Sequence, residues 1–182
     1  ASYSINNIKN SFIRLDLTYA SEFNKNNRRS VNLSRSFYSV FAKNAGGIFL
    51  ENTLSSEFFP VADTLVEASL KFEFQEYWYG RAFRMGKNSI KDAIYTNFIT
   101  AVNFNKKVYL LNPDASLDSS SFFTTEKNII GYFGLSKQRF YQDNYVFNYD
   151  IIEDIPYGHN IALIFGYQDK NNFSRWYSGI TL

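Results

Sequence analysis

Long segments of this sequence alternate apolar and polar residues with a period of two. Because successive side chains of a β-strand point to opposite faces, such a segment has one face in an apolar medium and the other in water. Strands of soluble proteins are typically about 5 or 6 residues long, whereas a tilted strand needs about 9 to 11 to cross a bilayer. The clearest case sets Val66, Ala68, Leu70, Phe72 and Phe74 against Glu67, Ser69, Lys71, Glu73 and Gln75.

The alternation predicts nine strands in an all-β, antiparallel meander. The intervening segments are rich in Asn, Asp, Gly and Lys, and Asn and Gly tolerate the positive φ of tight hairpin turns. Predicted turns are Asn24–Asn27, Gln142–Asn144, Pro156–Gly158 and Asp169–Asn172. Predicted strands are 11–22, 29–41, 46–54, 65–79, 92–106, 127–140, 145–154, 160–169 and 173–182. We expect residues 1–182 to form one domain, an outer-membrane β-barrel or a large segment of one.

Three predicted connections are longer than the rest: Ser55–Thr64, Gly80–Lys91 and Lys107–Glu126. Membrane barrels alternate short turns on one side with long loops on the other. Here the three long connections are consecutive, so the sequence predicts a departure from that alternation. Residues 11–22 and 173–182 are the predicted edge strands.

Composition narrows the functional classes. The chain has 182 residues and a formal charge of +2, with charges spread along the sequence, so nothing indicates nucleic acid as a partner. No apolar run approaches the ~18 residues of a membrane helix. Aromatic residues make up 19% of the chain, yet the mean hydropathy is −0.29. Strands with lipid on one face and water on the other combine many aromatic residues with a low mean hydropathy, and so does an aromatic-rich soluble sandwich.

Aromatic residues gather near the predicted strand ends, where Tyr and Trp of membrane barrels form girdles at the lipid headgroups. The strongest cluster provides five candidate pore or interface residues: Tyr77, Trp78, Tyr79, Arg81 and Arg84. A guanidinium between aromatic residues can project into a pore or stack on a ring. Period-two patterning alone leaves a soluble β core with aromatic corners as an equal alternative.

No residue pattern indicates catalysis. His159 is the only histidine and follows a predicted turn, and the chain has no cysteine. The carboxylate pairs Glu73 with Glu76 and Glu153 with Asp154 are neighbours in sequence, which does not create the facing pair of a glycosidase. Signatures of nucleotide-binding loops, serine hydrolases and zinc proteases are absent from the sequence. We therefore expect a noncatalytic protein without a cofactor or metal.

Several segments resemble barrels of the bacterial surface-antigen superfamily, which includes outer-membrane assembly and two-partner-secretion proteins. Residues 31–39, followed by Ala45-Gly46-Gly47, are similar to the strand, turn and strand near the start of those barrels. Residues 77–83 and 153–158 resemble further segments of less-studied branches. The family's barrels have more than nine strands, so the resemblance implies that this chain is a portion of a barrel. Its inward loop carries an Arg-Gly-aromatic motif, whereas Gly80-Arg81 has the reverse order.

The sequence thus favours a noncatalytic barrel component of the Gram-negative outer membrane. The resemblance implies a role in protein insertion or translocation, without assigning that role to any residue. Expected partners are outer-membrane lipid, other envelope proteins and the missing remainder of the barrel. The alternative is a soluble antiparallel β-sandwich that binds ligands or proteins through its long loops. Nine is an odd strand count, so we expect either a miscounted small closed barrel or, as the resemblance favours, a segment with unpaired edges.

Overall fold

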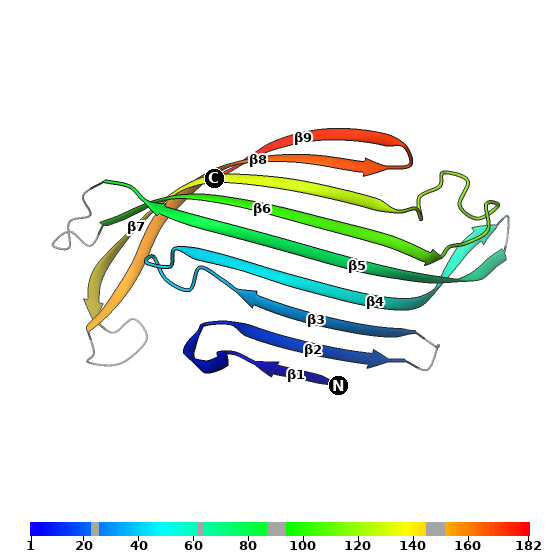
Figure 1. Ribbon diagram of the computed structural model, residues 1–182, viewed down its shortest axis with the longest axis horizontal. Coiled ribbons are helices and arrows are strands. Elements are labelled where there is room, and N and C mark those ends of the chain that lie inside the picture. Colours follow the sequence, from blue (N-terminus) through cyan, green and yellow to red (C-terminus); the bar gives the residue numbers. More distant parts are fainter. Residues whose placement is uncertain (23–25, 62–63, 87–93, 145–151) are drawn as a thin grey trace.

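The computed structural model of the protein describes residues 1–22, 26–61, 64–86, 94–144 and 152–182. These residues form one antiparallel sheet in which every strand pairs with its sequence neighbours (Figure 1). A single 3-10 turn, η1 (Ile8–Asn10), is the helical element of the described residues. The strands are β1 (Ser2–Ile5), β2 (Arg14–Ser21), β3 (Asn27–Arg35), β4 (Asn44–Val61), β5 (Thr64–Arg84), β6 (Ile94–Leu111), β7 (Glu126–Asn144), β8 (Ile152–Lys170) and β9 (Phe173–Thr181).

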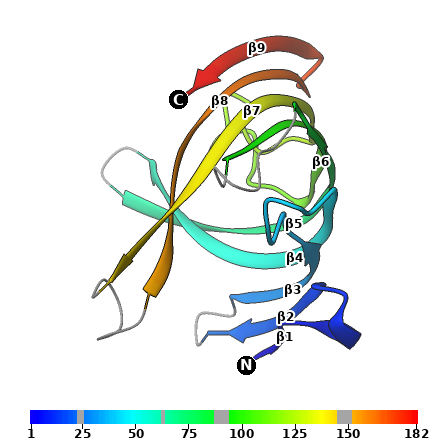
Figure 2. The same cartoon turned by 90° about the vertical axis from the view of Figure 1, so that its left-hand side faces the viewer.

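The sheet is strongly curved and open. Seen from its end, it bends from β1–β3 through β4–β6 to β8 and β9, and the β6–β7 connection lies inside the curve (Figure 2). The strand order runs from β1 to β9 without a pairing between these two strands. The predicted all-β antiparallel meander is therefore confirmed, and the alternative of a small closed barrel is wrong for the described residues.

The turn between β8 and β9 confirms one hairpin prediction. Asn171 and Asn172 both have positive φ, 55° and 60°. Asparagine tolerates this left-handed region because its short amide bonds to nearby backbone, and two such residues in sequence match the twist of a tight hairpin.

Two other predicted turns are wrong. Gln142–Asn144 belongs to β7, and Pro156–Gly158 lies within β8, where Pro156 pairs with Phe140. The predicted strands 145–154 and 160–169 correspond to one strand, β8, although residues 145–151 lie outside the described part. Local turn preferences were overridden here because the two strands pair along an unusually long ladder.

Of the three predicted long connections, Lys107–Glu126 is confirmed in shortened form as residues 112–125, Ser55–Thr64 is wrong, and Gly80–Lys91 lies partly outside the described residues. Residues 55–61 extend β4 and residues 80–84 extend β5, so these two strands are joined across residues 62–63. The strand ends that precede and follow residues 22–26, 62–63, 112–125 and 171–172 lie at the right-hand end of Figure 1, and those that precede and follow 6–13, 36–43, 85–93 and 145–151 lie at the left-hand end. Short and long connections therefore alternate, with 112–125 as the exception.

The N-terminal edge differs from the prediction. Residues 11–22 are not an edge, because β1 pairs with β2 from Ser2 opposite Thr18 to Ile5 opposite Leu15. A four-residue strand is too short for its alternation to be recognised in sequence. At the other edge the prediction is confirmed, since β9 pairs with β8 alone among the described residues.

Pairing register assigns the two faces of the sheet, and it corrects the expected lipid face of residues 66–74. Leu70, Phe72 and Phe74 share a face as predicted, but that face is the concave one, which also carries Glu51 opposite Phe74. Leu70 is only 3% exposed. The aromatic residues of the β6–β7 connection cover this part of the concave face, so the alternation here reflects packing within the protein and not contact with lipid.

Glycines on the concave face make room for aromatic rings. A Cβ on Gly166 would lie 1.9 Å from the ring of Tyr177, its partner on β9, whereas a Cβ on Gly179 would meet nothing within 4 Å. We expect Gly166→Ala to lower the free energy of unfolding by about 1–3 kcal/mol through overpacking. The matched Gly179→Ala change should leave the free energy of unfolding nearly unchanged. Both variants are measured by urea unfolding in detergent. Equal losses from both variants would contradict this role of Gly166.

Candidate membrane-facing surface

The convex face of the sheet carries a continuous belt of exposed hydrophobic side chains. Register places one or more of them on every strand, because residues directly opposite one another in neighbouring strands lie on the same face. From β1 to β9 the belt comprises Tyr3; Leu17 and Tyr19; Val31 and Leu33; Ile48 and Leu50; Tyr77, Tyr79 and Phe83; Phe98 and Val102; Ile129, Phe133 and Leu135; Ile161, Leu163 and Phe165; and Trp176 and Ile180.

Charged residues set the limits of the belt. On β7 the convex positions between Lys127 and Lys137 carry no charge, and on β8 the same is true between His159 and Asp169. Ten residue steps at about 3.4 Å measure roughly 34 Å along the strand, and a tilt of about 40° reduces the height to about 26 Å. This matches the apolar band of about 25 Å on membrane barrels.

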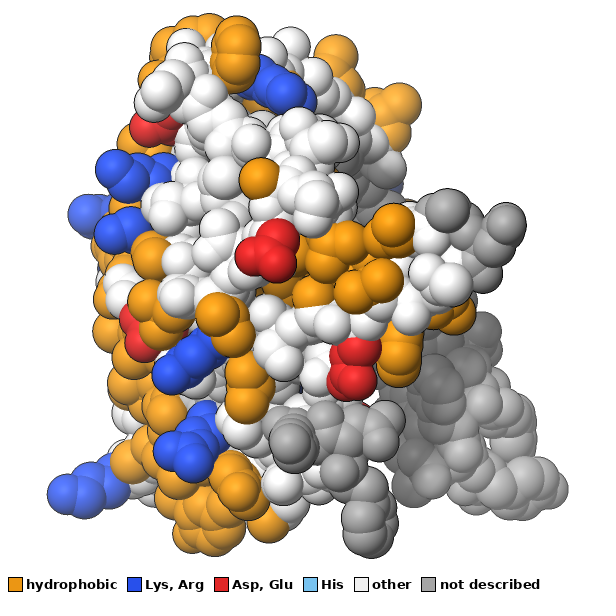
Figure 3. Space-filling model, turned by 90° about the vertical axis from the view of Figure 1, so that its right-hand side faces the viewer, with side chains coloured by type: hydrophobic (Ala, Val, Ile, Leu, Met, Phe, Trp, Pro, Cys, Tyr) orange, Lys and Arg blue, Asp and Glu red, His pale blue; other side chains and the backbone are white. Residues whose placement is uncertain are grey.

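The described residues bury few large side chains, and the chain exposes more surface than a compact protein of its mass. A compact protein of this mass exposes roughly 9,100 Å², whereas this chain exposes 12937 Å². The buried hydrophobic residues of the described part are Ala42, Ala45, Leu70 and Ala162. Large apolar side chains therefore lie mainly on the surface. Figure 3 views the right-hand end of Figure 1, and hydrophobic side chains alternate with Lys and Arg along its left, convex edge.

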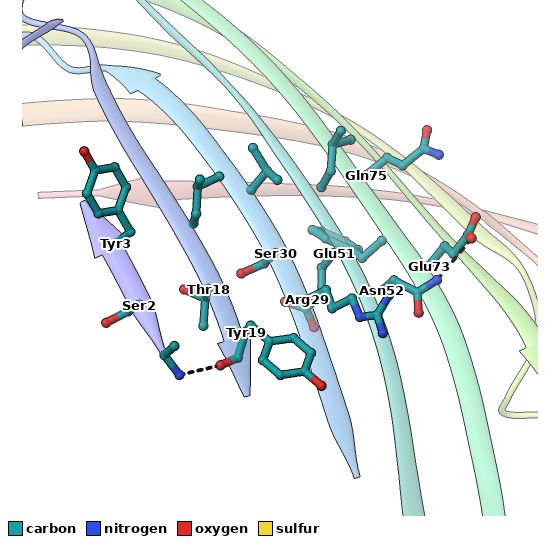
Figure 4. A pocket seen from close by; sticks show the side chains of 15 residues that line it. Ser2, Tyr3, Thr18, Tyr19, Arg29, Ser30, Glu51, Asn52, Glu73 and Gln75 are labelled. Atoms are coloured by element: carbon teal, nitrogen blue, oxygen red, sulfur yellow. Dashed lines mark hydrogen bonds between the residues drawn. The ribbon is translucent and has the colours of Figure 1, made fainter. Parts of the chain in front are cut away.

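A shallow hollow of about 620 Å³ marks the belt's border on β1–β5 (Figure 4). The Arg29 guanidinium lies 5.6 Å from the centroid of the Tyr19 ring. Asn52 Nδ2 donates a hydrogen bond of 3.2 Å to Glu73 Oε1, and the N-terminal ammonium donates to the Tyr19 carbonyl at 2.6 Å. An apolar floor rimmed by tyrosine, arginine and carboxylate is typical of the boundary between lipid tails and headgroups.

The concave face is polar at the same level of the sheet. A transverse row, with one residue per strand in direct register, crosses all nine strands and is interrupted by a single apolar residue. From β1 to β9 it comprises Ser4, Asp16, Asn32, Phe49, Glu76, Asn105, Asn128, Gln168 and Arg175.

Hydrogen bonds connect the middle of this polar row. Asn128 Nδ2 donates to Asn105 Oδ1 at 2.8 Å, and Asn105 Nδ2 donates to Asn103 Oδ1 at 3.1 Å. Asn103 Nδ2 then donates to Glu76 Oε1 at 2.5 Å. Near the N-terminal edge, Asp16 accepts hydrogen bonds from the Ser4 hydroxyl and Arg14. Such groups are costly to place in hydrocarbon, so this face is suited to water.

The ion pairs found among the described residues reinforce the contrast between faces. All of them lie on the concave side: Arg14 with Asp16, Arg28 with Glu51, and Lys170 with Glu126. The convex belt between its charged borders contains none of these pairs. The sheet thus separates an apolar outer surface from a charged, hydrogen-bonding inner one.

Two connections fold onto the concave face at opposite ends. In residues 112–125, the Phe123 ring lies 5.7 Å from Phe59 and 5.6 Å from Tyr109 between ring centroids. In residues 36–43, Phe41 lies 5.1 Å from Tyr95, and Asn97 Nδ2 donates to the Val40 carbonyl at 3.0 Å. These contacts cover apolar side chains at the two ends of the concave face, and the polar row lies between them.

The five candidate residues from the sequence do not form one site. Tyr77, Tyr79 and Arg81 lie on the convex face, where the Tyr79 hydroxyl donates to Asn44 Oδ1 at 2.9 Å and Arg81 lies 5.2 Å from the Phe83 ring. Trp78 and Arg84 lie on the concave face. The Trp78 ring covers Gly47, and the Arg84 guanidinium lies 4.9 Å from the Phe41 ring.

His159 occupies a convex position in β8 and pairs with Lys137, so it is not in a turn. It stands at the left-hand border of the belt. No group of histidine, cysteine or acidic residues suited to a metal ion occurs within the described ranges.

Sequence reasoning missed the polar row and the border hollow. Both depend on pairing register across strands, which no single strand reveals. A usable signal existed for the row, because Asn103 and Asn105 alternate with the apolar residues Val102 and Phe104. For the hollow, Tyr19 and Arg29 each end an alternating segment.

Comparisons with known proteins add no identification: no family model, no curated protein and no solved structure matches this chain. The resemblance to the surface-antigen superfamily therefore stays a prediction. Within the part of the chain that the structure describes, no helix has the length and apolar character needed to cross a membrane.

Proposed function

We propose that this chain is a noncatalytic component of an outer-membrane β-barrel, with its convex belt against lipid acyl chains and its concave face toward water. The observation that carries this proposal is the belt itself. It places exposed hydrophobic side chains on all nine strands, and its height on β7 and β8 fits a bilayer. On β5 the charged residue Arg81 lies inside the belt, between Tyr79 and Phe83, with its guanidinium 5.2 Å from the Phe83 ring.

Comparison of the two faces favours lipid over a second protein layer. A soluble β-sandwich needs another sheet packed about 10 Å away over one face, and the described residues form a single sheet. If this curved sheet closed around a core in water, its concave face, with the hydrogen-bonded polar row, would form that core. Here the apolar side faces outward and the ion pairs face inward, which is the arrangement that a membrane barrel requires.

The proposal extends to location and partners. Strands can span a bilayer only within a closed sheet, and such barrels are characteristic of the Gram-negative outer membrane. Lipid is thus the first partner, and the polypeptide that completes the barrel is the second. A role in protein insertion or translocation, as implied by the family resemblance, remains a prediction without an assigned residue.

Flotation tests this function. The chain refolded in detergent is reconstituted into phospholipid vesicles, washed with alkaline carbonate and centrifuged through a density gradient. We expect the chain to float with the vesicles and to resist the wash, because its belt lies among acyl chains. A chain that stays folded and monomeric in detergent-free buffer and fails to float would contradict the proposal and support the soluble binding module.

A further inference from the structure

The β9 edge is long and unpaired among the described residues, and the concave Arg175 is the one inward-pointing charge that protects it. β8 pairs with β9 from Ala162 opposite Thr181 to Lys170 opposite Phe173, and no described strand pairs with its other side. Edge strands are usually blunted by shortness, proline or inward-pointing charge. β9 contains no proline, and its single charged residue is Arg175. The opposite edge is different, since β1 spans only Ser2–Ile5.

An unpaired β9 is the energetically costly part of this sheet in the lipid environment proposed above. Backbone N–H and C=O groups have no water to bond in hydrocarbon, and each unsatisfied group costs several kcal/mol. A strand that covers this edge would therefore stabilise the sheet in a bilayer.

Strand direction restricts the identity of that strand. In a meander of nine strands, β1 and β9 run in the same direction. A second copy with the same membrane orientation would bring its β1 beside β9 as a parallel pair. Antiparallel closure, with an even total, instead requires an odd number of additional strands from other polypeptide.

We propose that β9 accepts an antiparallel strand whose sequence differs from this chain, a conclusion that rests on the membrane function proposed above. Trp176 and Ile180 of β9 are 80% and 68% exposed on the convex side, so the incoming strand should carry apolar residues at its convex positions. Tyr177 on the concave side already covers Gly166 of β8. Polar or small residues suit the concave positions of the incoming strand.

Disulfide trapping tests both the docking and its direction, because the chain has no cysteine of its own. Ser174→Cys and Ile180→Cys introduce single thiols at convex positions near the two ends of β9. The missing strand is represented by synthetic peptides with the β8 sequence Asn160–Asp169, because this sequence pairs antiparallel with β9 and has apolar residues at its convex positions. Each peptide carries an added cysteine at either the first or the last position. A peptide of scrambled sequence that lacks the alternation is the control.

Antiparallel docking predicts that the first-position thiol links to residue 180, and the last-position thiol to residue 174, about tenfold more than the reverse, because proximity raises effective concentration. The opposite preference, equal linkage by the scrambled peptide, or a disulfide-linked homodimer of the Ile180→Cys chain in place of peptide linkage would overturn the inference. Circular dichroism verifies that both variants keep their strand content. Flotation is measured separately, so loss of lipid binding with intact trapping would refute the membrane function alone.

Discussion

Val102→Lys is expected to destabilise the bilayer-inserted protein by about 2–4 kcal/mol, the cost of a cation at the lipid-facing middle of a barrel strand. Val102 is 50% exposed on the convex face of β6, close to midway between the polar residues that limit the belt on that strand. The measurement is urea unfolding of protein reconstituted in phospholipid vesicles.

The adjacent residue provides the matched control. Asn103 lies at the same depth on the concave face and donates to Glu76 at 2.5 Å. Asn103→Lys replaces the amide donor beside that carboxylate by an ammonium donor and exposes the Asn105 amide to water, so the free energy of unfolding should fall by less than about 1 kcal/mol. Equal costs for Val102→Lys and Asn103→Lys would mean that the two faces meet the same medium.

Leu70→Ala should be the most destabilising truncation in β5, lowering the free energy of unfolding by about 2–5 kcal/mol. Leu70 is 3% exposed and is the only large side chain among the buried hydrophobic residues of the described part. Its neighbourhood on the concave face is covered by the aromatic residues of the β6–β7 connection, so truncation leaves a cavity within protein.

Leu65 is the control for this truncation, because it lies in the same strand and is 69% exposed. Leu65→Ala should change the stability by no more than about 0.5 kcal/mol. The measurement for both variants is urea unfolding in detergent micelles. A loss for Leu70→Ala as small as that for Leu65→Ala would show that the connection does not protect Leu70.

Alternation in sequence predicted the fold class because it depends only on the geometry of a single strand. Residues 161–167 illustrate this, since their odd positions are apolar and all lie on the convex face. Hairpin chemistry was sufficient where both turn residues needed positive φ, as at Asn171 and Asn172. It failed at Pro156, where pairing with β7 continues through a sequence typical of a turn.

Face assignment required information that one strand does not hold. The even positions of residues 66–74 are apolar, yet they lie on the side of Glu51 and Glu76. Farther along the same strand, Tyr77 and Tyr79 contribute to the convex belt. In β5, which is longer than the bilayer is thick, the apolar residues therefore lie on the concave face at one end and on the convex face at the other. Only the register with neighbouring strands, and the connection folded over Leu70, distinguish protein contact from lipid contact.

The two tryptophans allow the most direct test of the lipid-facing belt, because each lies on a different face. Trp176 is exposed on the convex side of β9, and Trp78 lies on the concave side of β5. The variants Trp78→Phe and Trp176→Phe each keep a single tryptophan. Quenching of its fluorescence by lipids brominated in their acyl chains shows whether that tryptophan contacts hydrocarbon. Strong quenching of Trp176 with little quenching of Trp78 is the predicted result. Equal quenching of the two, or stronger quenching of Trp78, would contradict the assignment of the convex face to lipid.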